Sequence, residues 1–233
     1  MPVTTPSMAT RVVAEAVGTA LLLATVVGSG IMGERLAGGN LAIALLANTL
    51  ATGGGLTALI LTLGPISGAH FNPAVTVAYA SQGGLPWRHV SLYVAAQVLG
   101  AIVGVLVAHL MFGEQLLSVS THERSGLAQM FSEFIATFGL LSVIWGCSRR
   151  RPELVPFAVG AYIVAAYWFT ASTSFANPAV TLARALTNTF AGIRPADVPA
   201  FIAAQVLGAA AATFLFRWLA PAQVAVPFVG APK

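Results

Sequence analysis

The chain has 233 residues, of which 57% are hydrophobic and only 8% are charged, and its mean hydropathy is +0.84. A soluble domain carries a charge on about a quarter of its residues, so this composition predicts a membrane protein. The formal net charge of +4 comes without a basic face or interleaved aromatic residues, which argues against a nucleic-acid partner, and a single cysteine excludes an intrachain disulfide framework.

Six segments are long and apolar enough to cross a bilayer, whose hydrocarbon core of roughly 30 Å needs about 20 apolar residues per helix. In chain order they are 11–31, 41–63, 89–112, 128–147, 154–172 and 199–219. The first segment has one flanking arginine, contains Glu15 and lacks a small-residue cleavage site, so we interpret it as a retained helix rather than a removed signal peptide. The expected fold class is an all-α membrane protein.

Two further apolar segments, "NPAVTVAYA" and "NPAVTLARAL", are only about ten residues long, which is too short to span and is typical of re-entrant half-helices. Each begins with Asn, a good helix N-cap, followed by Pro, which suits the first helical position. The two motifs are Asn72-Pro73-Ala74 and Asn177-Pro178-Ala179. One copy alone would be an ordinary helix start, whereas two copies in equivalent places point to a shared function.

The chain repeats itself once, with the matches in the same order in both halves. The matches are Glu15-x-x-x-Thr19 with Glu133-x-x-x-Thr137, the Asn-Pro-Ala motif, and the string "AAQVLGA", which contains Gln97 and Gly100 in one copy and Gln205 and Gly208 in the other. They define halves 1–115 and 125–222 within a single domain, 1–233. Because each half holds an odd number of spans, the second half enters the membrane from the opposite side, and such inverted repeats place their site near the midplane.

The arginines predict the orientation of the chain. The loop between the fourth and fifth spans contains Arg149, Arg150 and Arg151, and the positive-inside rule places it in the cytoplasm, together with both termini. Seven of the eleven basic residues then lie on the cytoplasmic side, and Arg35, Arg124, Arg184 and Arg194 lie outside or in the outer part of the molecule. We expect a multi-pass protein of the cell (inner) membrane.

Two half-helices that enter from opposite faces bring their N-termini together at mid-bilayer. Each N-terminus carries roughly half a positive charge and unpaired backbone N–H groups, so this point repels cations. The amides of Asn72 and Asn177 would offer hydrogen-bond donors to a neutral polar molecule. Irregular backbone before each motif, "GPISGAH" and "FTASTSFA", is tolerated at this depth where it lines a water-filled cavity or is buried in protein.

The paired strings "SGAHFNPAVT" and "SFANPAVT", in a plan of six spans and two halves, resemble the aquaporins and aquaglyceroporins, the major intrinsic proteins. The resemblance implies a right-handed bundle of six transmembrane helices and two half-helices, one pore per subunit, a homotetramer and passive conduction of water or small neutral or polar solutes. It also implies that Glu15 and Glu133 support the loop backbones; His70 is expected to fix the loop or line the pore. It implies no cofactor, no metal and no catalytic residue.

The position after the second motif is Val180, where members of this family usually have Arg. Counting along the family's spacing places the other three filter residues at Thr52, Ala165 and Ser174, or at Phe175 in place of Ser174 if the register shifts by one. All four are small, which predicts a wide pore with relaxed selection by size and charge. A filter with Val at this position resembles a bacterial aquaglyceroporin branch linked to arsenic-resistance operons, which passes arsenite and methylated arsenicals.

Arg184 follows Val180 by one helical turn, which places its guanidinium roughly 6 Å further out on the same face. One hypothesis is that the positive charge has moved to the outer vestibule, where it attracts oxyanions or polar solutes. The alternative is that Arg184 pairs with a loop carboxylate such as Asp197 or Glu123.

Three other classes of function remain to be weighed. A water-selective channel is disfavoured by the missing aromatic residue and Arg in the expected filter. A secondary transporter with broken helices would use the two carboxyls within the spans, Glu15 and Glu133, and normally has more spans. A membrane enzyme is weaker still, because the four histidines show no metal-ligand spacing and no nucleophile stands beside a base.

Overall fold

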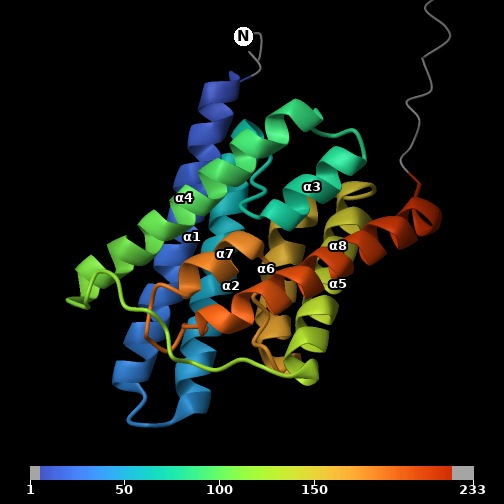
Figure 1. The fold of residues 1–233 in the computed structure, drawn as a ribbon. Coiled ribbons are helices and arrows are strands. Elements are labelled where there is room, and N and C mark those ends of the chain that lie inside the picture. Colours follow the sequence, from blue (N-terminus) through green and yellow to red (C-terminus); the bar gives the residue numbers. More distant parts are fainter. Residues whose placement is uncertain (1–5, 222–233) are drawn as a thin grey trace, which may run out of the picture.

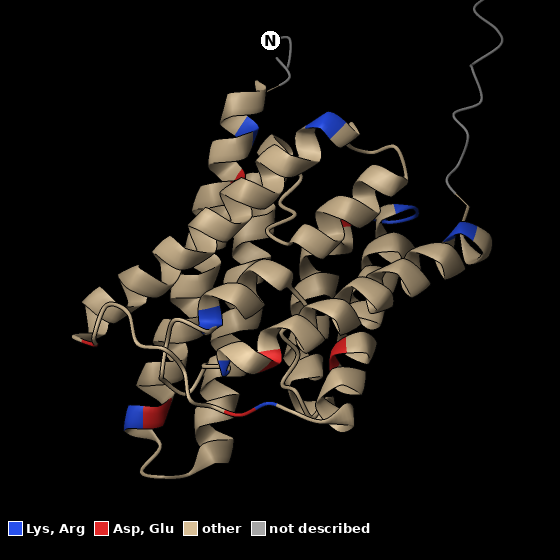
Figure 2. Cartoon of the chain, in the orientation of Figure 1, with Lys and Arg blue, Asp and Glu red and all other residues tan. Residues whose placement is uncertain are grey.

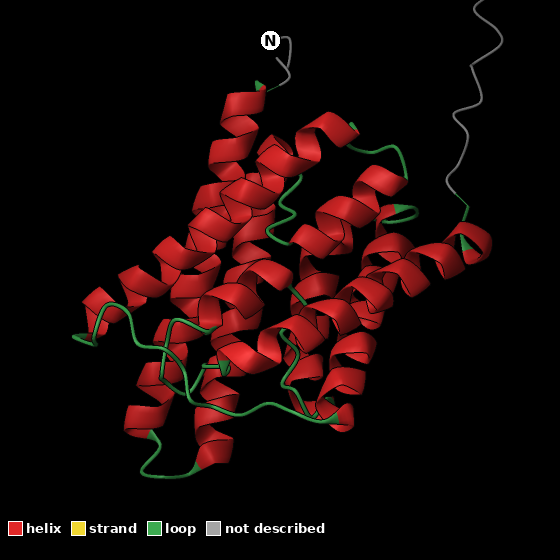
Figure 3. Cartoon of the chain, in the orientation of Figure 1, coloured by secondary structure: helices red, strands yellow, loops and turns green. Residues whose placement is uncertain are grey.

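The computed structural model describes residues 6–221 as helices joined by loops, without a strand in that range (Figure 3). Six helices are long and apolar enough to cross a membrane. They consist of α1 (Met8–Leu36), α2 (Leu41–Ser67), α4 (Trp87–Phe112), α5 (Leu127–Ser148), α6 (Val155–Phe169) together with the turn before it, and α8 (Val198–Leu219) together with the turn before it. The shorter elements are α3 (Pro73–Ser81), α7 (Pro178–Arg184) and the 3-10 turns η1 (Pro152–Leu154) and η2 (Pro195–Asp197) (Figure 1). The all-α fold with six spans and two half-helices is confirmed.

Local chemistry explains where the half-helices begin. Both Asn72 and Asn177 have extended backbone, and each side-chain oxygen accepts a hydrogen bond from the backbone N–H two residues ahead, at 2.9 Å from Ala74 and 3.0 Å from Ala179. A proline then occupies the first helical position, where its missing N–H costs no hydrogen bond. The sequence rule for these two starts therefore matches the structure in both halves.

The fifth span is shorter than the expected 154–172, because α6 ends at Phe169. Thr170 has extended backbone and begins an irregular segment that continues to Asn177. In the first half, α2 continues to Ser67 and ends at Gly68, whose φ of +93° is the left-handed C-cap that glycine adopts at little cost. The two irregular segments before the motifs are thus of different lengths.

The first and third spans of each half make close contact with each other. α1 packs along α4, and α5 packs along α8. A Cβ added to Gly100 would overlap the carbonyl oxygen of Ala16, and one added to Gly208 would overlap the carbonyl oxygen of Phe134. Small residues let helix backbones approach closely inside a membrane, where water supplies no hydrophobic force between helices. The repeated Gly of "AAQVLGA" is therefore a packing residue at both positions.

The ends of the helices divide the molecule into two faces. The starts of α1 and α4 lie at the top of Figure 1, and the α5–α6 connection and the end of α8 lie at its right, above the middle, so all four lie toward one end of the molecule. Lys, Arg, Asp and Glu lie mainly toward the two ends of the molecule, and few of them lie on the long helices between these ends (Figure 2). Large apolar side chains point outward along these helices, among them Leu21, Leu50, Leu99 and Phe214. Lipid or a neighbouring subunit is the environment that such a surface requires.

Candidate functional site

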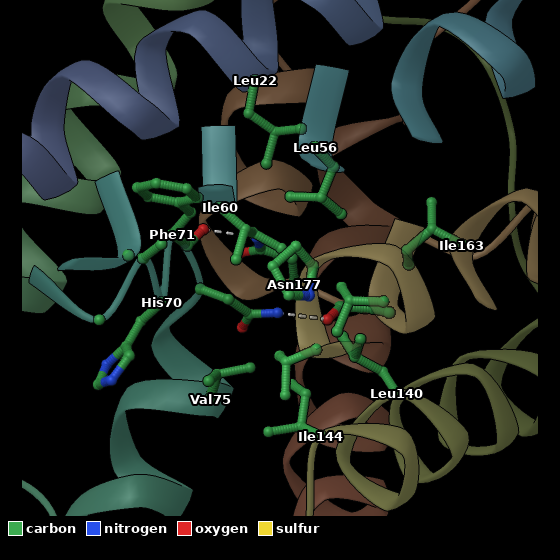
Figure 4. Close-up of a pocket in the computed structure, with 18 of the residues that line it drawn as sticks. Leu22, Leu56, Ile60, His70, Phe71, Val75, Leu140, Ile144, Ile163 and Asn177 are labelled. Atoms are coloured by element: carbon green, nitrogen blue, oxygen red, sulfur yellow. Dashed lines mark hydrogen bonds between the residues drawn. The ribbon is translucent and has the colours of Figure 1, made fainter. Parts of the chain in front are cut away.

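The two Asn-Pro-Ala motifs meet at the centre of the molecule. Asn72 Nδ2 donates a hydrogen bond to the carbonyl oxygen of Ala176 at 2.7 Å, and Asn177 Nδ2 donates to the carbonyl oxygen of Phe71 at 2.8 Å. Figure 4 shows these two bonds among apolar side chains. Each amide uses its oxygen to cap its own helix and one N–H to hold the opposite loop, which leaves one N–H on each amide for a passing solute. The positive ends of α3 and α7 therefore face one region.

In the last residues before each Asn-Pro-Ala motif, residues with positive φ alternate with residues of ordinary φ. Ala69 and Phe71 in the first loop, and Ser174 and Ala176 in the second, have positive φ values between 48° and 50°. Such non-glycine residues cost on the order of 1–3 kcal/mol each and persist where the surroundings impose them. Alternation of this kind turns successive backbone N–H groups toward one point and creates a site for an anionic group.

A buried glutamate occupies that point in each half. Glu15 accepts hydrogen bonds from the backbone N–H groups of His70 and Phe71, at 3.0 and 2.8 Å. Glu133 accepts from the N–H groups of Phe175 and Ala176, at 2.8 and 2.9 Å. Both carboxyls are fully buried and face donors, which leaves them no free position for carrying protons between sites. Their contacts are those of groups that hold the loops.

A glutamine bridges each glutamate to the neighbouring half-helix, which the sequence interpretation did not foresee. Gln97 Nε2 lies 2.7 Å from Glu15 Oε2 and 2.9 Å from Thr76 Oγ1. The equivalent distances from Gln205 Nε2 are 2.6 Å to Glu133 and 2.8 Å to Thr181. The signal for this role was the exact recurrence of Gln in the repeat, because a residue needed for packing alone would not have to carry an amide.

His70 lies beside the first motif, where it contacts both the loop and the cavity. Its Nδ1 is 3.1 Å from Thr76 Oγ1, and its ring packs edge-on against Tyr79 with centroids 4.9 Å apart. It also lines the central cavity. The structure therefore places it where either expected role, loop fixation or pore lining, is open to it.

A cavity of about 560 Å³ runs past both motifs. It is lined from Pro152 and Glu153 at the α5–α6 connection, through Asn72 and Asn177, to Arg184 at the end of α7. Its walls are mainly aliphatic, and the labelled side chains in Figure 4 include Leu22, Leu56, Ile60, Val75, Leu140, Ile144 and Ile163. An apolar wall with a few polar atoms at one level is the usual construction of a site that selects small solutes.

Three of the four expected filter residues, Thr52, Ser174 and Val180, line this cavity. Ala165 does not, and its assignment to the filter was wrong: it is exposed on the outer surface of α6. Tyr167 lines the cavity instead, and its hydroxyl donates to Thr52 Oγ1 at 3.3 Å. Side chains two residues apart in a helix point about 200° away from each other, so an error of two residues in the count placed the expected side chain on the opposite face of α6.

The correction changes the character of the filter, because one of its four side chains is now aromatic. Phe175, the alternative to Ser174, lines the cavity as well, so both residues contribute to the wall. The ring of Phe175 also packs edge-on against Phe201, with centroids 5.3 Å apart, whereas the hydroxyl of Ser174 has no hydrogen-bond partner among the described residues.

Arg184 lines the cavity at the end of α7 and makes neither of the ion pairs that the sequence left open. Its Nε donates to the carbonyl oxygen of Ala191, and its guanidinium carbon lies 3.4 Å from the centre of the Phe175 ring. Asp197 and Glu123 both contact Arg194 instead, at 2.9 and 3.5 Å. The hydrogen bond that Arg194 donates to Asp197 raises the pKa of Arg194. The pairing hypothesis for Arg184 is therefore wrong.

Comparison with known proteins identifies the architecture. Residues 2–174 and 150–232 match the model of the family described as Major intrinsic protein. The chain belongs to this family. It is 57% identical over 209 residues to Aquaglyceroporin AqpS of Rhizobium meliloti (strain 1021), which covers 90% of this chain and 89% of that protein. It is 31% identical to Aquaporin NIP6-1 of Arabidopsis thaliana, over 90% of this chain and 68% of that protein.

A solved structure has the same fold. The X-ray structure of the aquaglyceroporin from Plasmodium falciparum aligns with a TM-score of 0.75 and 20% identity, and the alignment covers 92% of this chain and 98% of that one. The resemblance inferred from the paired motifs is thereby confirmed. The major intrinsic protein described here is a multi-pass membrane channel of the aquaglyceroporin type, not an enzyme.

Proposed function

We propose that this aquaglyceroporin conducts small uncharged hydroxylated solutes down their gradients, with glycerol, arsenite, methylated arsenicals and water as substrates. The proposed filter consists of Thr52, Tyr167, Ser174 and Val180. The observation that carries the proposal is Val180, a buried apolar side chain on the cavity wall at the position where the family usually has a fixed cation. Without that cation, the constriction binds hydroxyls through neutral groups only.

The filter has one apolar and one polar side, which suits solutes of that kind. The ring of Tyr167 and the methyl groups of Val180 present carbon, whereas Thr52 and Ser174 present hydroxyls. Glycerol carries hydroxyls on one edge and a carbon chain on the other, and arsenite is a neutral trihydroxide at pH 7. Both would exchange hydrogen bonds with water for bonds to the filter, which lowers the cost of leaving water.

Charge selection is assigned to the midplane rather than to the filter. The N-termini of α3 and α7 each carry about half a positive charge, and Asn72 and Asn177 are held there by hydrogen bonds to the opposite loop. Cations are repelled at this point, and a water chain is interrupted because each amide offers donors only. A neutral solute crosses it with its own oxygens as acceptors.

Val180→Arg is the experiment that tests the proposal. In proteoliposomes, the native channel should conduct glycerol and arsenite, and Val180→Arg should reduce both at least about tenfold while water flux stays within about threefold. Val180→Met is the matched control, since it adds length without charge and separates bulk from the fixed cation. If the native protein passes only water, the chain is a water-selective channel and the proposal is wrong.

The alternative from another class of function is a secondary transporter, and flux measurements in the same proteoliposomes test it. Coupled transport would accumulate solute against its gradient, and this accumulation would need a free carboxyl at the midplane. Glu15 and Glu133, the carboxyls available there, are occupied by backbone N–H groups, which favours a passive channel.

The orientation is proposed from the arginines, with both termini in the cytoplasm of a cell whose inner membrane holds the protein. The α5–α6 connection with Arg149, Arg150 and Arg151 lies at the same end as the start of α1 (Figures 1 and 2). On a Cys147→Ser background, a membrane-impermeant maleimide applied to intact cells should label Gly38→Cys in the α1–α2 loop and leave Arg151→Cys unlabelled. The reverse labelling would show the opposite orientation.

A homotetramer is proposed from the family, and light scattering on the purified protein checks its mass.

A further inference from the structure

Two polar side chains at the outer end of the filter keep donors that the protein does not use. Arg184 is 2% exposed, and its Nε makes its one side-chain hydrogen bond among the described residues, to Ala191. Its Nη1 is buried without a partner, and so is the hydroxyl of Ser174. Leaving a buried donor unpaired costs about 1–3 kcal/mol, more for a charged group. Both residues line the cavity, so a ligand in the cavity is the remaining source of acceptors.

The charge around these donors is positive. The guanidinium carbons of Arg184 and Arg124 lie 3.4 and 5.0 Å from the centre of the same ring, that of Phe175. Arg124 donates to the carbonyl oxygens of Gly192 and Ser172, and no ion pair with a carboxylate forms at either arginine within residues 6–221. Burial lowers the pKa of Arg124.

The carboxyls of this region are turned to other groups. Glu133 is occupied by the N–H groups of the second loop and by Gln205, and Asp197 accepts from Arg194 and from the backbone N–H of Arg124. Glu123 contacts Arg194 and Ser125. An anion that reaches this end of the cavity therefore meets the Arg184 guanidinium without a competing carboxylate, and the charge of Arg124 lies nearby on the same Phe175 ring.

We propose that Arg184 and Ser174 form a binding subsite for oxyacid anions at the outer end of the pore, with Phe175 holding the guanidinium and Arg124 adding charge. The subsite rests on the proposed function, because its ligand is a solute on the conduction path. A guanidinium fork pairs with two oxygens of a tetrahedral oxyanion, and the serine hydroxyl donates to a third. The subsite accounts for those methylated arsenicals that are monoanions at pH 7, such as methylarsonate, beside the neutral solutes of the proposed function.

The position of Arg184 explains why the charge does not block the pore. It lies one turn outward of Val180, and its Nε is tied back to Ala191, so the constriction itself stays neutral. Conduction requires a site that binds strongly enough to admit a solute and weakly enough to release it. Further in, the positive ends of α3 and α7 favour a monoanion as they repel a cation, so an oxyanion meets no repulsive charge on the way to the midplane.

Methylarsonate influx into proteoliposomes tests the subsite, with arsenic content as the readout and potassium plus valinomycin to dissipate the membrane potential. At low ionic strength, Arg184→Met should reduce methylarsonate influx about tenfold and leave glycerol flux within about twofold, and Arg184→Lys should recover part of the loss. The matched control is Arg35→Gln, which removes a positive charge from the outer face at an exposed ion pair with Glu114. Raising the salt to about 0.15 M should narrow the difference between native protein and Arg184→Met.

Glycerol flux reports whether each variant forms an open channel. If Arg184→Met does not conduct glycerol, Arg184→Gln replaces it, because this change removes the charge and keeps an amide donor for the carbonyl oxygen of Ala191; methylarsonate influx should then fall several-fold. Equal loss of glycerol and methylarsonate in Arg184→Gln, or unchanged methylarsonate influx in both variants, would overturn the subsite. An equal loss in Arg35→Gln would also overturn it, since general surface charge would then explain the effect.

Crystals soaked in methylarsonate separate this inference from the proposed function. An anomalous arsenic peak within hydrogen-bond distance of Arg184 that is missing in Arg184→Met supports the subsite even if no flux is measured, in which case the proposed conduction fails and the subsite stands. Glycerol flux without such a peak, combined with unchanged methylarsonate influx in Arg184→Met, leaves the channel proposal intact and removes the subsite.

Discussion

Glu133→Leu should abolish glycerol flux and lower the thermal unfolding midpoint of the purified channel by about 6 °C or more. The change leaves three buried N–H groups without an acceptor: the backbone N–H groups of Phe175 and Ala176, and one N–H of Gln205 Nε2, whose other N–H keeps its bond to Thr181. Each orphaned donor costs about 1–3 kcal/mol, and the left-handed residues of the second loop lose the group that stabilises their conformation. Circular dichroism on heating and stopped-flow light scattering measure the two effects.

Glu123→Leu is the matched control for this prediction. Glu123 belongs to the outer loop and is 62% exposed in its ion pair with Arg194, so its loss should shift the midpoint by about 1 °C at most. Glu15→Leu should behave like Glu133→Leu, because Glu15 makes the equivalent contacts in the first half. A Glu133→Leu channel that conducts glycerol normally would show that the loop holds its shape without the carboxylate.

The repeat is what made the fold predictable from the sequence. Spans, half-helices and their starts follow from hydropathy, from length and from the Asn-Pro pair, all of which are local properties of the chain. The two copies then check each other, so that a short string with little meaning alone specifies a position in the membrane. The end of α6 was less predictable, because Phe169 and Thr170 lie in apolar sequence and the change of backbone depends on the loop that follows.

The filter was predicted in part, and the error has a geometric cause. Val180 directly follows the second motif within α7, and Thr52 was reached by counting back across only the short irregular segment 68–71, so counting places both on the cavity wall. Ala165 was reached by counting back across the irregular segment 170–177, whose path through space no periodicity describes. An error of two residues exchanges the lipid-facing and pore-facing sides of a helix, and so Tyr167 was missed.

Side-chain partners that are distant in sequence could not be predicted. Gln205 bridges Glu133 and Thr181, which lie 72 and 24 residues away, and the sequence offers only the repetition of the glutamine as a signal. The contact of Arg184 with the Phe175 ring likewise depends on how the second loop folds back over α7. Helical spacing placed Arg184 outside Val180 but did not reveal its partner.

Asn177→Asp should convert a cation-excluding midplane into a cation-tolerant one. The amide N–H that now donates to the carbonyl oxygen of Phe71 becomes a second oxygen, so two acceptors face each other, and glycerol flux should fall. A full negative charge then stands at helix N-termini that carry about half a positive charge each, which reverses the sign of the local field. Two opposite unit charges 4 Å apart attract each other by about 4 kcal/mol at an effective dielectric constant of 20. The carboxylate would lower the energy of a passing cation by an amount of this order, so the proton or potassium leak should rise at least about tenfold.

Two variants make the result specific to the midplane. Asn72→Asp changes the equivalent amide, which donates to the carbonyl oxygen of Ala176, and should produce the same leak. Asn188→Asp changes an exposed asparagine of the outer loop whose oxygen accepts from Thr121, and should leave the leak unchanged. The leak is measured as decay of a proton or potassium gradient in proteoliposomes that also report glycerol flux. Tight vesicles with Asn177→Asp would show that the half-helix dipoles do not set the barrier to cations, and that exclusion lies in the narrowness of the pore between Thr52 and Val180.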